Sequence, residues 1–254
     1  MIKKVVISAA GQGTRMQELS ENKSKHLIEV NSRPFLAYLL DNIIKAGYSE
    51  IMLVVGFRQD LVAEFLKTYA LPEGVTIGMV NQFEVLGPKE KMYGTACPLM
   101  CVKDFVGGDQ FVSLVGDNFY SVDDLKSMNI DDDFCYVGGL KNDHPEKFGV
   151  LLTEGDPSFD KSSEGEEFLK EIVEKPKEFV GDLINTSLYK FTPAVFEKLS
   201  LVSKSPRGEY EITDVISLLA RDKKVKVKTI KDNWMDFGRP EDVKTFETHF
   251  LKNG

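Results

Sequence analysis

Short apolar runs alternate with amphipathic segments over about the first ninety residues, and this alternation restricts the fold more than any other feature. The runs Lys4–Ser8, Ile51–Gly56 and Val75–Val80 are short and rich in β-branched residues, as is typical of strands buried on both faces. Between them, residues 35–46 and 58–69 carry apolar side chains at helical spacing. Strands that alternate with helices in this way predict an α/β fold with a doubly wound sheet and right-handed crossovers.

A fourth buried strand is expected over residues 111–118, and the pattern then changes. Residues 148–155 and 168–176 have the composition of antiparallel strands around the polar stretch 156–167, which predicts a solvated hairpin tip. The other predicted elements are a helix over 97–103, a strand over 183–191, a helix over 209–222, a strand over 225–230 and a helix over 240–253. We therefore predict a single domain over residues 1–254, with a nucleotide half up to about residue 120 and a mixed β half over about 121–254.

Composition places the chain among ordinary globular proteins and argues against a general nucleic-acid binder. The net charge is -8, whereas a nucleic-acid-binding domain requires a basic face. No stretch approaches the ~20 apolar residues of a membrane helix, and the apolar run at the N-terminus is too short for a signal peptide. Cys97, Cys101 and Cys135 lack the spacing of disulfides or zinc ligands. We therefore expect a cytoplasmic protein without nucleic-acid or membrane partners.

A glycine-bearing loop follows the first strand and is typical of phosphate binding. Gly11 and Gly13 allow the backbone to approach a ligand closely, and consecutive N–H groups in such a turn attract anions. Arg15 offers a planar fork for phosphate oxygens and Lys25 a movable positive charge. The loop matches neither the dinucleotide fingerprint, because Met16 replaces the third glycine, nor the P-loop, which ends in Gly-Lys-Ser/Thr.

Two aspartates are candidates for binding a divalent cation. Asp117 lies at the end of the fourth strand, where ligands bind in open α/β sheets. Asp236 follows Trp234, the only tryptophan, in a turn before the last helix. Mg²⁺ in proteins is commonly held by one or two carboxylates together with phosphate oxygens. Taken alone, each aspartate is equally consistent with a turn former.

A series of motifs runs in the order found in sugar-1-phosphate nucleotidylyltransferases, from Ile2 to about Phe250. These motifs are GQGTR with Lys25 ten residues after Arg15, GDN, FGV, EKP, NTSLY, RGEYEITD and WMDFGRPED. In them the chain resembles glucose-1-phosphate thymidylyl- and uridylyltransferases. The resemblance implies the Rossmann-like nucleotide-diphospho-sugar transferase fold, with a smaller antiparallel sugar-binding β region.

The same resemblance implies a reaction and its cofactor. A nucleoside triphosphate, dTTP or UTP, and a hexose 1-phosphate, glucose 1-phosphate, give a nucleotide sugar and pyrophosphate. The sugar phosphate oxygen attacks the α-phosphorus in line, assisted by Mg²⁺ and without a covalent enzyme intermediate. Because the sequence ends without the long C-terminal repeat domain of bifunctional relatives, we expect no acetyltransferase activity.

The resemblance also assigns a role to each matching residue. The catalytic residues are Arg15, Lys25 and Asp117, with Lys25 facing the α-phosphate, and the metal ligands are Asp117 and Asp236. The nucleotide-binding residues are Ala10, Gly11, Gly13, Thr14, Gln82, Gly94 and Thr95, of which the last three read the base. The sugar-phosphate-binding residues are Gly149, Glu174, Lys175, Asn185 and Arg207, with Lys175 and Arg207 on the phosphate.

The chain departs from the family pattern at several positions. Ser24 stands where a proline usually precedes the lysine, Ser187 replaces a glycine of the sugar pocket, and Arg239 replaces a threonine. The segment 83–93 is longer than usual and fits a lid, a base-reading loop or a solvated basic loop. These departures leave open the base and the sugar. The sequence also leaves open the oligomeric state, including a homo-oligomer.

Three other functions fit parts of the pattern. The first is a non-catalytic nucleotide-sugar-binding regulatory subunit, which would keep the fold without the charged site residues. The second is a nucleotidyltransferase that uses CTP, GTP or another phosphorylated acceptor. The third is a glycosyltransferase, which would require an Asp-x-Asp metal motif on a strand, whereas residues 131–133 are expected to form a solvated loop.

Overall fold

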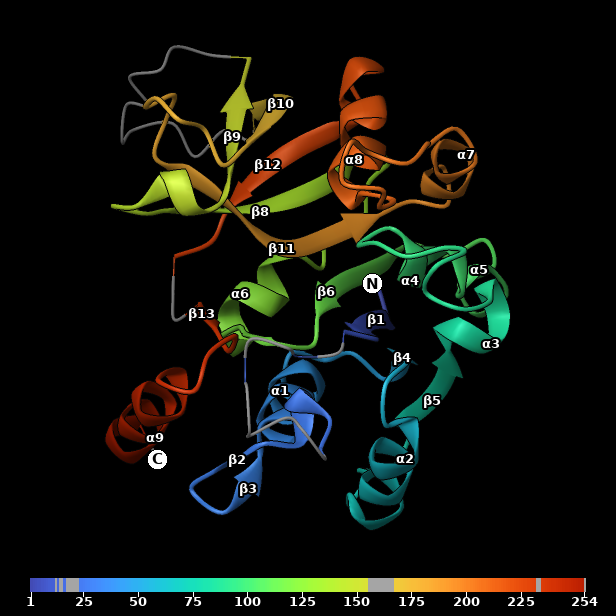
Figure 1. The fold of residues 1–254 in the computed structure, drawn as a ribbon, viewed down its shortest axis with the longest axis vertical. Coiled ribbons are helices and arrows are strands. Elements are labelled where there is room, and N and C mark those ends of the chain that lie inside the picture. Colours follow the sequence, from blue (N-terminus) through green and yellow to red (C-terminus); the bar gives the residue numbers. More distant parts are fainter. Residues whose placement is uncertain (12, 14–15, 17–22, 155–166, 232–233, 254) are drawn as a thin grey trace.

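The computed structural model describes residues 1–11, 13, 16, 23–154, 167–231 and 234–253, and the side chains in this set up to residue 250. Its centre is a single large sheet of nine strands among these residues (Figure 1). From one edge to the other, the strands are β5 (Thr76–Asn81), β4 (Glu50–Val55), β1 (Lys4–Ala9), β6 (Phe111–Val115), β11 (Leu183–Phe191), β8 (Cys135–Lys141), β12 (Val225–Thr229), β10 (Glu167–Glu174) and β9 (Gly149–Thr153).

Helices and short strands surround this sheet. The helices are α1 (Phe35–Lys45), α2 (Gln59–Thr68), α3 (Gln82–Leu86), α4 (Cys97–Met100), α5 (Lys103–Val106), α6 (Val122–Ser127), α7 (Val195–Leu199), α8 (Ile212–Arg221) and α9 (Asp242–Asn253), with the 3-10 turns η2 (Lys25–Leu27) and η3 (Pro145–Lys147). The short strands are β2 (Glu29–Val30), β3 (Arg33–Pro34), β7 (Asn118–Phe119) and β13 (Met235–Asp236).

The first half of the sheet has the predicted doubly wound order. Strands β5, β4, β1 and β6 run parallel, with β1 between β4 and β6. The chain passes from β1 to β4 and then β5 on one side, whereas β6 lies on the other side of β1. A topological switch point therefore lies between β1 and β6, and in such sheets ligands bind outside the carboxyl ends of the strands at that point.

Side chains of β1 alternate between two apolar cores, one on each face of the sheet. Val5 and Ile7 pack in a cluster with residues of α1, α2 and α6. Val6 packs on the opposite face with residues of α4, α5, α7 and α8. Burial on both faces explains why the strand reads as an uninterrupted apolar run in the sequence.

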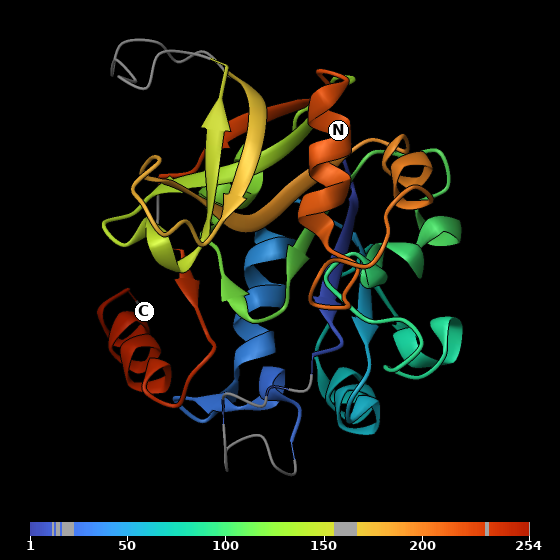
Figure 2. The ribbon, with the colours of Figure 1, turned by 45° about the horizontal axis from the view of Figure 1, so that its top comes forward.

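The second half of the sheet is continuous with the first. Strand β11 is antiparallel to both β6 and β8, and β12 runs parallel to β8. Strand β9 is antiparallel to β10 and also pairs with β11 at Val150 opposite Ile184, so that this end of the sheet folds back on itself. Figure 2 shows the yellow strands β9 and β10 side by side, with helix α8 next to β10. The predicted hairpin tip at 156–167 lies largely outside the described residues.

Two predicted segments differ from the structure. The helix expected over 97–103 is broken into α4 and α5, because Val102 between them takes φ -120° and ψ 11°. The segment after β5 begins with the short helix α3, where a loop was expected. The Asn81 side chain caps this helix by accepting hydrogen bonds from the N–H groups of Phe83 (2.8 Å) and Glu84 (3.4 Å). Asparagine is a favoured N-cap residue, so the signal is present in the sequence.

A third apolar cluster is largely aromatic and lies under the C-terminal part of the chain. The Phe35 ring at the start of α1 stacks on Phe237 with centroids 4.4 Å apart, and Phe246 of α9 meets Phe35 edge-on at 5.1 Å. Met16 and Phe119 belong to the same cluster. The cluster thereby fixes the segment that contains Asp236, which is strand β13 and not the expected turn, against the first half of the protein.

The expectation that residues 131–133 form a solvated loop is wrong for Asp132. Asp131 and Asp133 are exposed, but Asp132 accepts a hydrogen bond of 3.0 Å from Lys190, whose side chain is fully buried. The Lys190 ammonium also donates to the carbonyl oxygens of Asp132 and Phe134, both at 2.6 Å. A buried charge requires such partners, and Asp132 is therefore structural.

Candidate active site

The glycine loop after β1 packs directly against Lys25. Gly13 has φ +65°, and an added Cβ there would lie 2.9 Å from the Cβ of Lys25. At Gly11 an added Cβ would lie 3.9 Å from the Lys25 ammonium. The predicted residues Thr14 and Arg15 lie outside the described residues. A side chain at position 13 would therefore displace the lysine that the sequence assigns to the triphosphate.

Lys25 and Asp117 form an ion pair at the carboxyl edge of the sheet. The Lys25 ammonium donates to Oδ2 of Asp117, and the two side chains are 14% and 24% exposed. Burial is the largest influence and raises the pKa of the Asp117 carboxyl. Lys25, His26 and the hydrogen bonds to the carboxylate together lower it by more, so that the pKa lies below its ordinary value. Asp117 is therefore ionised at neutral pH.

The residues on either side of Lys25 form a buried polar contact. Oγ of Ser24 lies 3.0 Å from Nδ1 of His26, and both residues are buried. Burial and the neighbouring Lys25 lower the pKa of His26 to about 3, so the ring is neutral at pH 7. An added Cβ on Gly116 would lie 3.2 Å from the His26 ring nitrogen Nε2. The turn that holds Lys25 is thus fixed by a hydrogen bond where family members usually have proline at position 24.

The second predicted metal ligand, Asp236, lies on a strand paired with the segment that follows Asp117. Strand β13 is antiparallel to β7, with Asp236 opposite Asn118, and the N–H of Phe237 donates to the carbonyl of Asp117 at 2.7 Å. The Asp236 carboxylate is exposed and lies close to Gly238. Two carboxylates on adjoining backbone segments, one of them held ionised, are the oxygen donors that Mg²⁺ prefers. These residues therefore fit a magnesium ion.

Gln82 is a buried amide without a partner. It begins α3 and is 1% exposed, and neither Oε1 nor Nε2 has a hydrogen-bond partner among the described residues. Such groups are uncommon, and each costs about 1–3 kcal/mol when left unsatisfied. An added Cβ on Gly56, at the end of β4, would touch both Phe83 and the backbone of Ala10. Helix α3 therefore lies beside the glycine loop, where the sequence expects the base to bind.

The other two residues predicted at the base lie against the segment of Arg207. Gly94 has φ +139°, and a side chain there would overlap the backbone of Tyr210. Oγ1 of Thr95 donates to Glu211 at 3.2 Å, and Nη2 of Arg207 donates to the same carboxylate at 2.8 Å. Residues predicted to bind opposite ends of the reactants thus share one carboxylate, which the sequence analysis did not single out.

The residues predicted to line the sugar pocket meet at the start of β9. An added Cβ on Gly149 would lie 3.0 Å from Oε2 of Glu174 and 3.8 Å from the Cβ of Asn185. The backbone of Lys175, with φ +46°, donates from its N–H to the carbonyl of Phe148 at 2.9 Å. Among the described members of this set, Gly149, Glu174 and Asn185 converge, and Lys175 follows directly.

A bulge in β11 shapes the same region. Ser187 has φ +58°, a left-handed conformation that favours glycine, in keeping with the family's glycine at this position. The carbonyl of Thr186 accepts hydrogen bonds from Tyr120 (2.9 Å), Trp234 (3.2 Å) and Asn118 (3.3 Å). The bulge is therefore tied to the segments that carry both aspartates, and Tyr120 and Trp234 are positioning residues that the sequence analysis did not assign.

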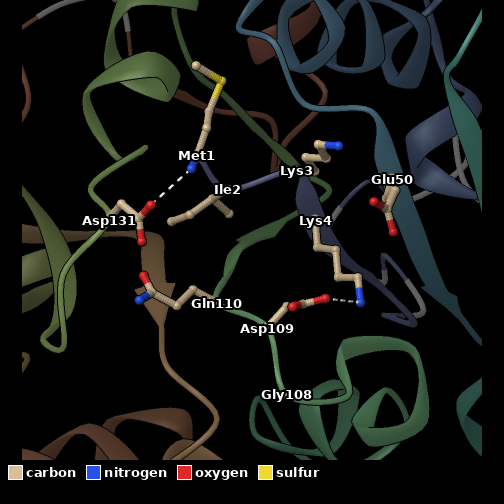
Figure 3. Close-up of a pocket in the computed structure, with 9 residues that line it drawn as sticks. All are labelled: Met1, Ile2, Lys3, Lys4, Glu50, Gly108, Asp109, Gln110 and Asp131. Atoms are coloured by element: carbon tan, nitrogen blue, oxygen red, sulfur yellow. Dashed lines mark hydrogen bonds and ion pairs between the residues drawn. The ribbon is translucent and has the colours of Figure 1, made fainter.

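A separate hollow of about 490 Å³ lies at the opposite, amino edge of the sheet (Figure 3). Four of its charged groups form two pairs: the Lys4 ammonium lies 2.7 Å from Asp109, and the amino group of Met1 lies 3.0 Å from Asp131. Because this hollow lies away from the switch point, we place the active site outside the carboxyl ends of the strands.

Two features are absent from the part of the chain that the structure describes. No helix in the described part of the chain is both long and apolar enough to cross a membrane. Within the same residues, no cluster of three or more histidine, cysteine, aspartate or glutamate side chains is arranged to bind a metal. A cation at the Asp117–Asp236 site would therefore require further oxygen ligands from the substrates.

Known proteins with similar sequences belong to the family that the motifs indicate. The model of the Nucleotidyl transferase family matches residues 4–253. The chain is 32% identical over 243 residues to the UTP--glucose-1-phosphate uridylyltransferase AglF of Haloferax volcanii, covering 93% of this chain and 92% of that protein. It is 31% identical to the bifunctional protein GlmU of Methanococcus vannielii, covering 98% of this chain but 55% of that protein.

Solved structures show the same fold. The structure of a UDP-glucose pyrophosphorylase complexed with UDP-glucose superposes with a TM-score of 0.82 at 22% identity, covering all of both chains. The apo form of a UDP-glucose pyrophosphorylase gives a TM-score of 0.83 at 21% identity, covering 100% of this chain and 99% of the other. The chain therefore belongs to the nucleotidyl transferase family, as an enzyme of the sugar-1-phosphate nucleotidylyltransferase type.

Proposed function

We propose that the protein joins UTP or dTTP to glucose 1-phosphate, giving a nucleotide sugar and pyrophosphate. The observation that carries this proposal is the ion pair of Lys25 and Asp117 outside the switch point of the sheet, with the backbone of the Asp236 segment bonded to Asp117. The glycine loop packs on the same lysine. A cation and two carboxylates next to a phosphate-binding turn are the groups that a reaction between two phosphate esters requires.

The chemistry is direct transfer rather than covalent catalysis. Burial raises the pKa of the Cys97 thiol to about 12 and that of Cys101 to about 11, so neither is a thiolate at neutral pH. His26 is buried and neutral, and its Nδ1 contacts Ser24. The rate enhancement then depends on positioning the two reactants and on fixed charges at the transferred phosphate.

Asp117 and Asp236 would hold the magnesium ion, which when bound neutralises phosphate charge and favours departure of pyrophosphate. Lys25 binds the triphosphate and lies on the Gly11–Gly13 turn that cradles it. Because the pKa of the Asp117 carboxyl lies below its ordinary value, the site holds a carboxylate for the cation before substrate arrives. Arg15 and Thr14 are proposed to complete this phosphate cradle.

Gln82 supports a pyrimidine as the base. Its unpartnered amide carries one acceptor and one donor group, which match the adjacent N–H and carbonyl on the edge of uracil or thymine. Gly94 makes room for the backbone of Tyr210, and Thr95 lies next to it. The similarity to a relative named as a UTP--glucose-1-phosphate uridylyltransferase supports the same choice.

The sugar 1-phosphate is proposed to bind over β9 and the β11 bulge. Glu174 accepts hydrogen bonds from sugar hydroxyls, and Gly149 and Asn185 line the pocket. Lys175 and Arg207 bind the sugar phosphate. These are small cytoplasmic metabolites, in keeping with the cytoplasmic location that we propose for the protein.

The decisive test measures pyrophosphate release. Purified protein is mixed with Mg²⁺, each of UTP, dTTP, CTP, GTP and ATP, and each of several sugar 1-phosphates. We expect UTP or dTTP with glucose 1-phosphate to give the highest kcat/KM, and omission of Mg²⁺ to abolish release. Preference for CTP or GTP would overturn the assigned base. Binding of a nucleotide sugar without release from any combination would instead identify a regulatory subunit.

A further inference from the structure

We propose that Glu211 is a positioning residue that couples the nucleotide and sugar-phosphate sites by holding Thr95 and Arg207 on one carboxylate. This inference rests on the proposed function, because it concerns the residues assigned there to the base and to the sugar phosphate. It adds a residue that touches neither reactant and predicts that a change on one side of the site alters binding on the other.

The Glu211 carboxylate is buried and accepts hydrogen bonds from three side chains. Its side chain is 9% exposed, and although Glu211 occupies the N-cap position of α8, it makes no side-chain capping bond. Its oxygens accept hydrogen bonds from Thr95 Oγ1 at 3.2 Å, Ser205 Oγ at 3.3 Å and Arg207 Nη2 at 2.8 Å. A buried carboxylate with several donors is a fixed point, because moving it would leave a charge without partners.

The Thr95 hydroxyl connects this carboxylate to the base loop. It donates to Glu211 and accepts a hydrogen bond of 2.9 Å from the N–H of Ile212, the first residue of α8. The backbone reinforces the contact, because Tyr210 donates to the carbonyl of Tyr93 and Ala96 donates to the carbonyl of Tyr210, both at 2.9 Å. The loop that carries Gly94 and Thr95 is therefore docked on the start of α8.

Arg207 is held by Glu211 while most of its side chain stays accessible. Its side chain is 59% exposed, and Nη2 is the guanidinium nitrogen that bonds to Glu211. A guanidinium carries five N–H donors in a rigid fork, so fixing one nitrogen orients the others. An exposed arginine without such a partner samples many rotamers and loses that orientation. Glu211 thus fixes the direction from which Arg207 meets a phosphate.

The shared carboxylate makes the two sites thermodynamically coupled. Removing the Thr95 hydroxyl takes one hydrogen-bond donor from Glu211. The Glu211 carboxylate is then less fixed and orients Arg207 less well, although Thr95 itself lies on the nucleotide side. Coupling free energies between sites are reciprocal and commonly correspond to factors of about 5–150 in affinity. We therefore expect substitutions at Thr95 to raise the KM for glucose 1-phosphate, and substitutions at Arg207 to raise the KM for the triphosphate.

The experiment compares steady-state constants for both substrates in wild type, Thr95→Val, Thr95→Ser, Glu211→Gln and the Thr95→Val/Glu211→Gln double variant. We expect Thr95→Val to raise the KM for glucose 1-phosphate about 5-fold or more, and Thr95→Ser to restore it. Glu211→Gln should raise both KM values, and the double variant should be no worse than Glu211→Gln alone. Glu197→Gln, at an exposed position on α7, is the matched control and should change neither.

Each result has a distinct meaning. If the wild type turns over but Thr95→Val changes only the triphosphate KM, or if the two substitutions act additively, the coupling is absent and Glu211 is merely structural. If the wild type releases no pyrophosphate with any pair of substrates, the proposed function falls and the inference with it. Circular dichroism and thermal melting of each variant identify misfolded protein, and Thr95→Ser still tests the hydroxyl if Thr95→Val fails to fold.

Discussion

The backbone N–H of Phe237 donates to the carbonyl of Asp117 at 2.7 Å, and this bond joins the two segments that carry the acidic residues of the site. Phe237 is fully buried and stacks on Phe35, so the bond is protected from water by the aromatic cluster. Asp236 precedes Phe237 directly and is therefore fixed relative to Asp117. If both carboxylates hold the proposed cation, this fixed backbone geometry lowers the cost of binding it.

Replacing Asp117 tests the assigned cation site. Asp117→Asn keeps the size of the side chain but removes its charge, so we expect kcat to fall by about 10²–10³ or more while the fold persists. Pyrophosphate release and circular dichroism measure the two effects. Asp109→Asn is the matched control, because Asp109 also pairs with a lysine but lies in the hollow at the opposite edge. Near-wild-type turnover in Asp117→Asn would refute the assignment.

Replacing Gln82 should change activity and stability in opposite directions. Gln82→Leu removes a buried amide that has no partner among the described residues, so we expect a gain of about 1 kcal/mol in the free energy of unfolding. The same change should lower kcat/KM for the triphosphate by tenfold or more, on the order of one lost base-reading hydrogen bond. Gln110→Leu removes another buried amide oxygen without a partner, but at the opposite edge, and should leave kcat/KM unchanged.

His26 should make the protein less stable in mildly acidic solution. Its pKa is about 3 in the folded protein against 6.5 ordinarily, so between these values the unfolded chain binds a proton that the folded protein excludes. The contribution of His26 to the free energy of unfolding is therefore fully present above pH 6.5. Below that pH it falls by about 1.4 kcal/mol per pH unit. Urea unfolding between pH 7 and pH 5 measures the slope. His26→Gln should flatten it, whereas His144→Gln, at an exposed position, should leave it unchanged.

Lys190 should be essential for stability despite its distance in sequence from the residues it binds. Lys190→Met leaves Asp132 and two carbonyl oxygens without their buried donor, and we expect the free energy of unfolding to fall by about 3–5 kcal/mol. Lys67→Met breaks an exposed pair with Glu64 and should change it by less than about 1 kcal/mol. Equal losses in the two variants would contradict the structural role of Lys190.

The left-handed backbone at Ser187 predicts a preference for glycine. Ser187→Ala and Ser187→Gly both remove the hydroxyl, which interacts with Tyr189, but only alanine retains the strain of φ +58°. We therefore expect the glycine variant to be more stable than the alanine variant by about 1 kcal/mol. Thermal unfolding of the two variants provides the comparison, and equal stabilities would show that the bulge relaxes.

Much of the first half was predictable because its signals are local. The β-branched runs became β1, β4, β5 and β6, and α1 ends at Lys45, just before Gly47, as the sequence indicates. Helix α3 after β5 was harder to predict, because the asparagine that caps it is equally common in loops. The break between α4 and α5 lies at Val102, whose backbone dihedrals are not helical. The spacing of apolar residues in the sequence does not predict such a break.

The sequence by itself determined the doubly wound order, the glycine turn and, through ordered motifs, the family and the identity of the candidate site residues. Periodicity and turn chemistry act over a few residues, so they can be read from neighbours in the chain. Only the tertiary structure decided that Asp236 lies beside Asp117, that Gln82 is buried without a partner, and that Thr95 and Arg207 share Glu211. These relationships depend on strand pairing and on packing between distant segments. Side-chain burial stabilises that packing, and the local sequence pattern does not encode it.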